Sequence, residues 1–289
     1  MLSHKSVKEN YGIMIINHNG SLREEKDQSG LYQNRAFNFG DGLYDVLHYV
    51  QGEVEFLEEH YFRLMSSMRM MRMKIPVDFT LEAYGTEIKK TAEANGIRKR
   101  AEVRVNFYRV GAGQVFPESN RSEFIIHVHE VNEGGLDDLE IELFKDFHVS
   151  SGLLSTIKTN NRMVNVLSAI FAHENGFQNS VLINEKKELV SASDANLFLV
   201  RDNRVLTPSL DCGCINGILR KKVIESVQGI PGLELEETSI SPFELLKVDE
   251  VFLTNSVWWI RSVSRYRKRS FGSEVAGRIK RQLTLAHSQ

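Results

Sequence analysis

A lysine just ahead of an amphipathic helix constrains this chain more than any other feature of its sequence. Residues 155–169 read STIKTNNRMVNVLSA and place Lys158 at the end of a short β-type run. Apolar residues then recur at a three-and-four spacing, which predicts a helix that stops at Asn175-Gly176. They are Met163, Val164, Leu167, Ile170 and Phe171. A lysine held at such a junction can be partly desolvated, which lowers an ammonium pKa and exposes the free amine as a nucleophile. The pattern alone is also that of an ordinary surface lysine, since the chain contains 36 Lys and Arg residues.

The composition is that of an ordinary globular protein. The 289 residues favour one or two domains, and the net charge is −2. A nearly neutral chain gives no electrostatic argument for nucleic acid or for an anionic membrane surface. No apolar stretch approaches the length of a membrane span, and the first residues, MLSHKSVKENYG, lack the apolar core of a signal peptide. We therefore expect a cytoplasmic protein that binds neither nucleic acid nor membrane.

The two cysteines of the chain, Cys212 and Cys214, lie in the segment DCGCING. No second pair completes the four ligands of a structural zinc site, and a disulfide across one intervening residue would be strained. We expect no metal here, and we interpret both cysteines as turn residues beside the start of a helix.

The first half of the sequence alternates short strands with helices. Asn-Gly at 19–20 and Gln-Gly at 51–52 each predict the turn of a hairpin. A helix follows with a core-facing stripe and stops before Pro76. The stripe consists of Tyr61, Leu64, Met65, Met68 and Met71. A second helix over residues 81–95 and two strands of alternating pattern complete this half.

A segment rich in glycine and acid, NEGGLDD at residues 132–138, marks the predicted domain boundary. Beyond the lysine segment, residues 180–208 predict a β-meander with turns at 184–187 and 202–203. A helix from Ile218 to about Val227, a strand VDEVFLTN and a C-terminal helix follow. The predicted fold class is therefore α/β (α+β), with an N-terminal domain over residues 1–131 and a C-terminal domain over residues 132–289.

Four segments, taken in order, resemble the class IV aminotransferases. They are NRAFNFGDGLYDVLHYVQGEVEFLEEHYFRL, the lysine segment, LVSASDANLFLVRDNRVLTP and CINGILRKKVIE. Together they carry an FGDG turn, HxxRL, K-x-x-N-R, Asn-Leu-Phe and N-G-I-x-R, and the resemblance extends from about residue 34 to residue 263. It implies the two-domain, D-amino acid aminotransferase-like fold of the fold-type IV enzymes, with a small N-terminal and a larger C-terminal domain. It also implies pyridoxal phosphate (PLP) as cofactor, a small amino substrate and a homodimer.

The resemblance assigns the covalent and charged contacts to PLP. Lys158 matches the family's Schiff-base lysine, and its context KTNNRM is most similar to that of the lyase members. In that role it would also carry the substrate proton. Arg63 of HxxRL matches the phosphate arginine, a role that suits a guanidinium fork, and His60 one turn earlier could orient it. Without the resemblance, Arg63 would be interpreted as an exposed helix arginine.

The remaining phosphate contacts implied by the resemblance come from two chain turns. Gly217, Ile218 and Leu219 begin a helix whose free N–H groups can hold a phosphate. Many members have a threonine at the position of Leu219, so this chain lacks one hydroxyl contact to the phosphate. A small polar pair after a late strand matches Asn255-Ser256, for which a simple strand-ending turn is an equal alternative.

The chain departs from the family at Ser191. Most members have a glutamate there, the E of E-G-x-x-x-N, which pairs with the pyridine nitrogen of PLP; Asn196 retains the Asn of that motif. A carboxylate keeps the nitrogen protonated, whereas a hydroxyl can bond the unprotonated nitrogen and leaves a weaker electron sink. Asp194 could substitute only if the strand turned it to the same side. This departure places full transamination in doubt.

The substrate side also departs from the aminotransferase members. The stretch GAGQVFPE lacks the arginine and histidine that D-amino acid transaminases use for the substrate carboxylate, and Met163 replaces a tyrosine of the branched-chain enzymes. Tyr44 matches a tyrosine that lines the substrate pocket, with core packing as the alternative. In TNSVWWIRSV, which resembles the lyase members, Trp258 and Trp259 either wall the pocket or pack in the core.

The resemblance is strongest to aminodeoxychorismate lyase, which implies release of pyruvate and formation of 4-aminobenzoate. Aromatisation of the product supplies driving force, so a weak electron sink would suffice. The alternative within the family is an amino acid aminotransferase of branched-chain or D-amino acid type. A PLP-binding homologue without turnover is a third interpretation, against which the retained Lys158 and Arg63 argue.

Overall fold

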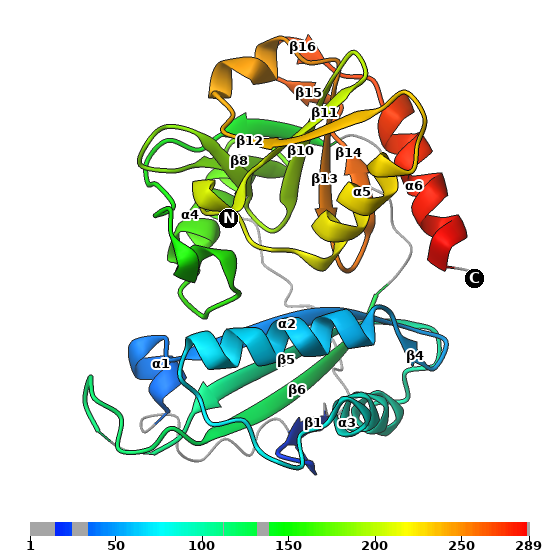
Figure 1. Cartoon of the computed structure of the whole chain (residues 1–289). Coiled ribbons are helices and arrows are strands. Elements are labelled where there is room, and N and C mark those ends of the chain that lie inside the picture. The colour runs from blue at the N-terminus through cyan, green and yellow to red at the C-terminus, as the bar shows by residue number, and fades with distance from the viewer. Residues whose placement is uncertain (1–14, 25–33, 112, 132–138, 288–289) are drawn as a thin grey trace, which may run out of the picture. The chain divides into compact units, whose positions relative to one another are not determined.

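The computed structural model describes residues 15–24, 34–111, 113–131 and 139–287 (Figure 1). The chain divides into two compact units. The first comprises Met1–Leu57 and Met68–Val131, and the second comprises Glu58–Ser67 and Asn132–Gln289. The central part of one helix therefore belongs to the second unit, while both of its ends belong to the first. The predicted boundary segment at 132–138 lies outside the described residues.

The first unit is built on a six-stranded antiparallel sheet in the order β2-β1-β6-β5-β3-β4. Its strands are β1 (Ile15–His18), β2 (Ser21–Glu24), β3 (Gly42–Val50), β4 (Glu53–Val54), β5 (Arg100–Arg109) and β6 (Ser122–Glu130). Both predicted hairpins are confirmed: β1 and β2 turn at Asn19-Gly20, and β3 and β4 turn at Gln51-Gly52. All four turn residues have positive φ, which explains why Asn and Gly stand in these turns.

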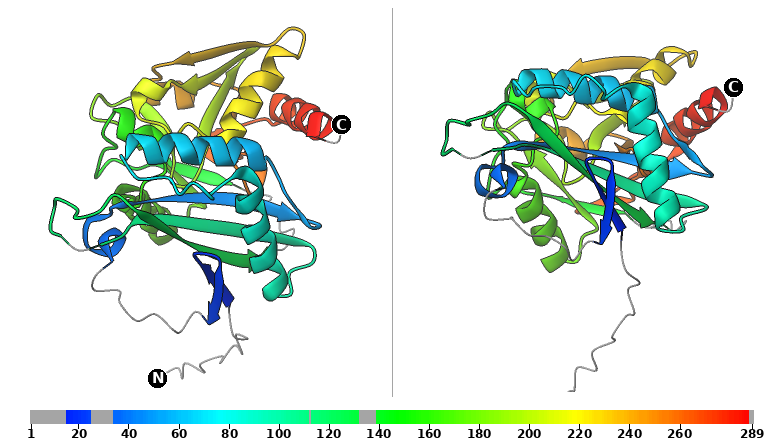
Figure 2. Two further views of the ribbon diagram at one scale, coloured as in Figure 1. Left: turned by 60° about the horizontal axis from the view of Figure 1, so that its bottom comes forward. Right: turned by 90° about the horizontal axis from the view of Figure 1, so that it is seen from below.

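The helices α1 (Arg35–Phe39) and α3 (Leu81–Ala94) contact this sheet, whereas α2 (Leu57–Met70) is the helix that is divided between the two units. Thr80 caps the start of α3 by accepting a hydrogen bond from Ala83 N, and α3 contacts β1 and β6 (Figure 2). Leu64, Met65 and Met68 of the predicted α2 stripe are buried. Met71 lies just beyond the helix, because α2 ends at Met70.

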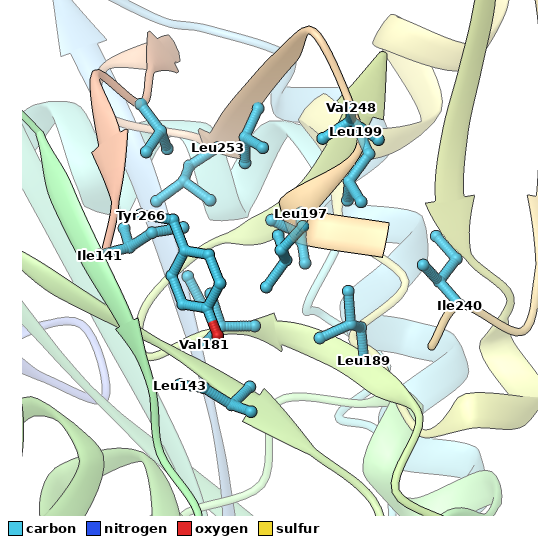
Figure 3. Packing of buried hydrophobic residues seen from close by; sticks show 14 of the residues in the cluster. Ile141, Leu143, Val181, Leu189, Leu197, Leu199, Ile240, Val248, Leu253 and Tyr266 are labelled. Carbon is cyan, nitrogen blue, oxygen red and sulfur yellow. The ribbon is translucent and has the colours of Figure 1, made fainter. Parts of the chain in front are cut away.

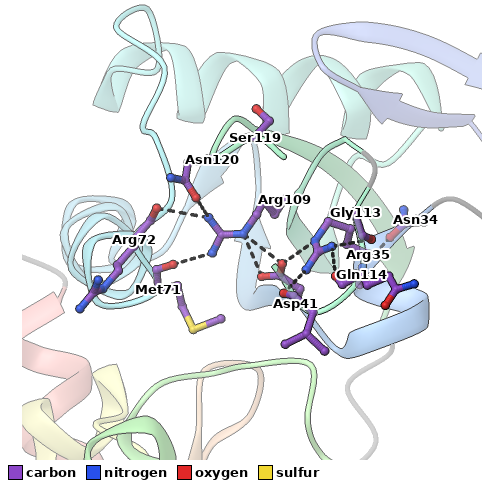
Figure 4. A network of polar contacts seen from close by, with 12 residues as sticks. Asn34, Arg35, Asp41, Met71, Arg72, Arg109, Gly113, Gln114, Ser119 and Asn120 are labelled. Carbon is purple, nitrogen blue, oxygen red and sulfur yellow. Dashed lines mark hydrogen bonds and ion pairs between the residues drawn. The ribbon is translucent and has the colours of Figure 1, made fainter. Parts of the chain in front are cut away.

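Two buried arginines share one carboxylate at the FGDG turn that leads into β3 (Figure 4). Asp41 accepts hydrogen bonds from Arg35 Nε at 2.9 Å and from Arg109 Nε at 3.0 Å. The remaining guanidinium donors reach main-chain carbonyls, including those of Gln114 and Met71. These bonds satisfy the buried charges and fix the FGDG turn against the neighbouring loops.

The second unit contains two five-stranded sheets, ordered β12-β11-β10-β13-β14 and β16-β15-β7-β8-β9. The first consists of β10 (Asn196–Arg201), β11 (Arg204–Pro208), β12 (Glu234–Thr238), β13 (Glu250–Asn255) and β14 (Trp259–Ser262). The second consists of β7 (Glu140–Leu143), β8 (Asn179–Ile183), β9 (Leu189–Ala192), β15 (Arg265–Tyr266) and β16 (Arg269–Ser270).

The predicted β-meander is wrong in one respect, since β9 and β10 belong to different sheets. The chain changes sheet at a tight turn closed by Ala192 N donating to Ala195 O at 2.9 Å. Asn179 Oδ1 accepts from Ser193 N in the same turn. The hairpins on either side, β8–β9 and β10–β11, are antiparallel as predicted.

Successive residues of β10 face two different cores. Leu197 and Leu199 point into a cluster between the two sheets, together with Ile141, Val181 and Leu253 (Figure 3). Phe198 and Val200 belong to a second cluster, which they form with buried side chains of α5 (Ile218–Gln228) and α6 (Glu274–His287). Burial on both faces makes this sheet a rigid support for residues at its edge. No helix in the described ranges is long and apolar enough to cross a membrane.

Candidate functional site

Lys158 is half-buried and lies in an irregular segment, not at the end of a strand. The predicted β-type run is wrong, because a 3₁₀ helix (Leu153–Thr156) precedes the lysine. Thr156 Oγ1 donates to Leu153 O at 2.7 Å, a local side-chain bond that competes with strand formation. The predicted helix is confirmed as α4 (Met163–Glu174), which ends at Asn175-Gly176.

Main-chain bonds hold the lysine segment beside the start of α5. Asn216 N donates to Thr156 O at 2.9 Å, and Asn216 directly precedes Gly217. Arg162 Nη2 donates to Ile157 O at 2.7 Å and so closes the chain around Lys158. The lysine and the α5 N-terminus, which lie far apart in the sequence, are thus joined within one unit.

The start of α5 depends on Asn196. Asn196 Nδ2 donates to Ile215 O at 2.8 Å, and a Cβ at Gly217 would lie 2.3 Å from Asn196 Oδ1. Glycine at 217 is therefore required by the neighbouring asparagine, a reason that the sequence did not reveal. Ile218 and Leu219 are buried, so their side chains are committed to the core and only their N–H groups face the helix N-terminus.

Asn255 ends β13 and Ser256 follows it, and both lie near the start of β10 because Asn196, the first residue of β10, pairs with Thr254. Asn255 Oδ1 accepts from Val257 N at 3.0 Å and from Trp258 N at 3.1 Å, which is the geometry of a strand-ending turn. Ser256 is buried and makes no side-chain hydrogen bond to any described residue.

These groups fit a phosphate. The N-cap Gly217 offers no side chain to the first amides of α5, and the first turn of α5 carries no acidic residue. Thr254 Oγ1 is buried without a hydrogen-bond partner in the described ranges of the chain. Unused N–H and O–H donors at one edge, without a carboxylate in the helix turn, are suited to an anion.

Ser191 lies on β9 opposite Leu182 and is 8% exposed. Its hydroxyl makes no hydrogen bond to the part of the chain that the structure describes. Asp194 does not take over the position of the family glutamate, because it is exposed and accepts a hydrogen bond from Asn179 Nδ2 at 2.7 Å. A hydroxyl is thus the polar group that β9 presents at the position where the resemblance leads us to expect a glutamate.

Hydrogen bonds also tie the turn after Ser191 to α4. Asn165 Nδ2 donates to Ser193 O at 2.7 Å. Buried hydroxyls of Ser168, Ser180 and Ser193 bond one another at 2.9 and 3.0 Å. The helix that follows Lys158 is therefore fixed to the turn that follows Ser191, a connection that the sequence analysis missed.

Arg63 lies on the part of α2 that belongs to the second unit. Its Nη2 is 3.3 Å from Nδ1 of His60, which is fully buried, so the predicted contact between these two side chains is present. The sequence analysis missed a second contact of this helix, an ion pair of Glu59 with Lys222 on α5 at 2.6 Å. The sequence feature that could have indicated this ion pair is the glutamate one helical turn before Arg63.

The ion pair between α2 and α5 is charged at neutral pH. Burial, the largest single cause, would raise the pKa of Glu59, but the hydrogen bonds to Lys222 and to the main chain and the nearby charge of Lys222 together outweigh it and lower that pKa. Burial alone would likewise lower the pKa of Lys222, but bonds to Glu59 and Glu225 raise it. Both shifts favour the charged forms of the pair.

The two predicted substrate residues lie in different units. Tyr44 is a half-buried residue of β3, and the Arg104 guanidinium lies 4.3 Å from the centre of its ring. Trp258 packs against the core between the two sheets, with the Arg261 guanidinium 4.9 Å from its ring. Both aromatic side chains are partly exposed and carry a cation on one face.

Cys212 and Cys214 are free and buried in the turn before α5, as their interpretation as turn residues predicts. Burial raises the pKa of Cys214 to about 11 and also raises that of Cys212. Both thiols are protonated at neutral pH and so are poor nucleophiles.

Comparison with known proteins identifies the family. The family profile "Amino-transferase class IV" matches residues 42–266, most of the chain. The chain belongs to the class IV aminotransferases. An aminodeoxychorismate lyase from Vibrio harveyi is 26% identical over 235 residues, which cover 80% of this chain and 85% of that protein. A D-alanine aminotransferase from Bacillus licheniformis is 25% identical over 282 residues, which cover 94% of this chain and 95% of that protein.

The solved structures confirm the fold. A branched-chain aminotransferase from Thermoproteus uzoniensis, crystallised with norvaline, superposes with a TM-score of 0.86 at 20% identity and covers 96% of both chains. The fold is that of the fold-type IV enzymes, and this class IV protein is a PLP-dependent enzyme.

Proposed function

We propose that this enzyme is an aminodeoxychorismate lyase, which releases pyruvate from its substrate and forms 4-aminobenzoate. The observation that carries the proposal is the buried Ser191 on β9, at the position where most members are expected to have glutamate, while Asp194 is exposed and bonds Asn179. The similarity to the Vibrio harveyi lyase supports the same reaction.

In this proposal the phosphate of PLP is bound by Arg63, by the N–H groups of Ile218 and Leu219 at the start of α5, where Gly217 permits close approach, and by Ser256. Asn196 shapes the α5 start, and Asn255 holds the turn that presents Ser256. Ser191 bonds the pyridine nitrogen. When bound, PLP supplies an electron sink whose strength depends on the protonation of that nitrogen.

Lys158 carries the chemistry in two roles. Its amine would hold the cofactor covalently in the resting enzyme. With the substrate 4-amino group bound in its place, Lys158 Nζ would take the proton from the ring carbon that bears the amino group; the ring C–O bond to the enolpyruvyl group would then break, and the enolpyruvate would take up a proton and become pyruvate. The ring becomes aromatic in the same step, which supplies driving force that a transamination lacks. Tyr44 and Trp258 are proposed to contact the substrate.

Replacing Ser191 with glutamate should favour amino transfer. A carboxylate beside the pyridine nitrogen would raise the nitrogen's pKa and strengthen the electron sink. We expect the half-reaction with amino acids to accelerate about tenfold or more, because one pKa unit is about 1.4 kcal/mol. Stopped-flow absorbance of the bound cofactor measures this rate, and the Ser191→Gln variant controls for side-chain size. Fast amino transfer by the wild type, unchanged in the Ser191→Glu variant, would contradict the role of Ser191.

A second candidate is an amino acid aminotransferase of branched-chain or D-amino acid type. The D-alanine aminotransferase of Bacillus licheniformis matches more of the chain than the lyase does, which favours this candidate. The loop GAGQVFPE argues against it, because it contains no arginine or histidine for a substrate carboxylate.

We also propose that the enzyme is a homodimer. Three large apolar side chains at helical spacing on α4 stay exposed in the single chain: Met163 at 68%, Val166 at 51% and Ile170 at 46%. Exposed apolar stripes of this kind are typical of protein interfaces. Light scattering should give twice the chain mass of 33.0 kDa, and a monomer at micromolar concentration would contradict the proposal.

A further inference from the structure

We propose that Glu59 and Lys222 are positioning residues, whose ion pair holds the Arg63 turn of α2 at the distance from α5 at which Arg63 can bind the cofactor phosphate. The inference rests on the phosphate role proposed for Arg63, and not on which reaction the enzyme catalyses. Neither residue touches the cofactor in this proposal.

The position of the ion pair on each helix carries the argument. Glu59 and Arg63 are four residues apart on α2, so they lie on the same face one turn apart. Lys222 is likewise one turn beyond Ile218, the first residue of α5. The 2.6 Å contact between Glu59 Oε1 and Lys222 Nζ therefore links the turn next to Arg63 with the turn next to the α5 N-terminus.

The division of the chain gives independent support. Only Glu58–Ser67 of α2 belongs to the second unit, and this stretch contains Glu59, His60 and Arg63. His60 is fully buried and its Nδ1 lies 3.3 Å from Arg63 Nη2. The ion pair to α5 holds the adjacent residue, Glu59, so the turn that precedes Arg63 is fixed both by the burial of His60 and by Lys222.

The charges of the pair are matched on the two helices. Lys222 engages Glu59 Oε1 of α2 at 2.6 Å, whereas the second carboxylate near Lys222, Glu225, is 3.7 Å away on its own helix. Lys222 therefore directs its shorter contact to α2, the helix that carries Arg63.

The test compares binding of PLP with binding of pyridoxal, which lacks the phosphate, to the full-length chain by equilibrium dialysis. Replacing Glu59 with glutamine should weaken PLP binding about two- to fivefold, the range of partly exposed ion pairs, and leave pyridoxal binding unchanged. Lys222→Gln should weaken PLP binding by a similar factor and also leave pyridoxal binding unchanged, and it provides the test if the Glu59 variant does not fold. Glu225→Gln is the matched control, because it removes a carboxylate near the same lysine without touching α2.

Two further comparisons decide between positioning and general stabilisation. In the Arg63→Ala background, Glu59→Gln should have no further effect on PLP binding. In the chain that retains Arg63, the double variant Glu59→Lys with Lys222→Glu should recover most of the PLP affinity that the single variants lose. An equal loss in both backgrounds, or an equal loss for pyridoxal, would overturn the positioning role. If Arg63→Ala itself left PLP binding unchanged, the phosphate role proposed for Arg63 would be wrong, which is a separate outcome.

Discussion

Replacing Lys158 with alanine should reduce turnover by roughly 10²–10⁴-fold or more, because one residue supplies both the covalent amine and the base. The segment around Lys158 is fixed by bonds from Asn216 to Thr156 and from Arg162 to Ile157, so no neighbouring amine is expected to move into its place. Borohydride reduction of the wild type should attach the cofactor permanently to Lys158, and peptide mapping identifies the labelled residue.

Lys145→Ala is the matched control for that experiment, because Lys145 is an exposed lysine of the same unit. It should retain full labelling and full activity. Label on any lysine other than Lys158, or a Lys158→Ala variant with normal turnover, would show that the cofactor assignment is wrong.

Replacing Arg63 with alanine should weaken PLP binding about ten- to hundredfold, which corresponds to roughly 1.5–3 kcal/mol for hydrogen bonds to a charged group. Arg63→Lys should recover only part of this loss, since an ammonium keeps the charge but not the two-pronged geometry. Titration of the protein with PLP, followed by tryptophan fluorescence, measures the affinity. The control is Arg69→Ala, an exposed arginine of the same helix.

PLP binding that is equally weak in the Arg63→Ala and Arg69→Ala variants would indicate a general electrostatic effect. Unchanged binding in both would identify Arg63 as an ordinary surface arginine. Only a selective loss at position 63 agrees with the proposed phosphate site.

Local signals in the sequence predicted local structure. Asn19-Gly20 and Gln51-Gly52 form hairpin turns because their residues tolerate positive φ, and Asn175-Gly176 ends α4 for related reasons. The FGDG, HxxRL and N-G-I-x-R motifs identified the family, since each specifies a short piece of backbone together with its chemistry. The family profile confirms that identification.

Features that depend on contacts between distant segments were not predicted. The switch from β9 to β10 between two sheets depends on Asn179 bonding to the turn at Ser193, and a periodic pattern of apolar residues does not encode it. The 3₁₀ helix before Lys158 has β-type composition but is set by local bonds such as that of Thr156. The reason for Gly217 became visible only beside Asn196. The pair of Glu59 with Lys222 joins residues from opposite halves of the chain.

The most direct test of the proposed lyase reaction is a pair of assays on the purified wild-type enzyme. One follows pyruvate and 4-aminobenzoate released from aminodeoxychorismate, and the other follows amino transfer from amino acids to 2-oxoglutarate. With a hydroxyl at Ser191 we expect equal amounts of pyruvate and 4-aminobenzoate, formed much faster than any transfer of amino groups. Rapid amino transfer without release of pyruvate would contradict the lyase proposal and identify the enzyme as an aminotransferase.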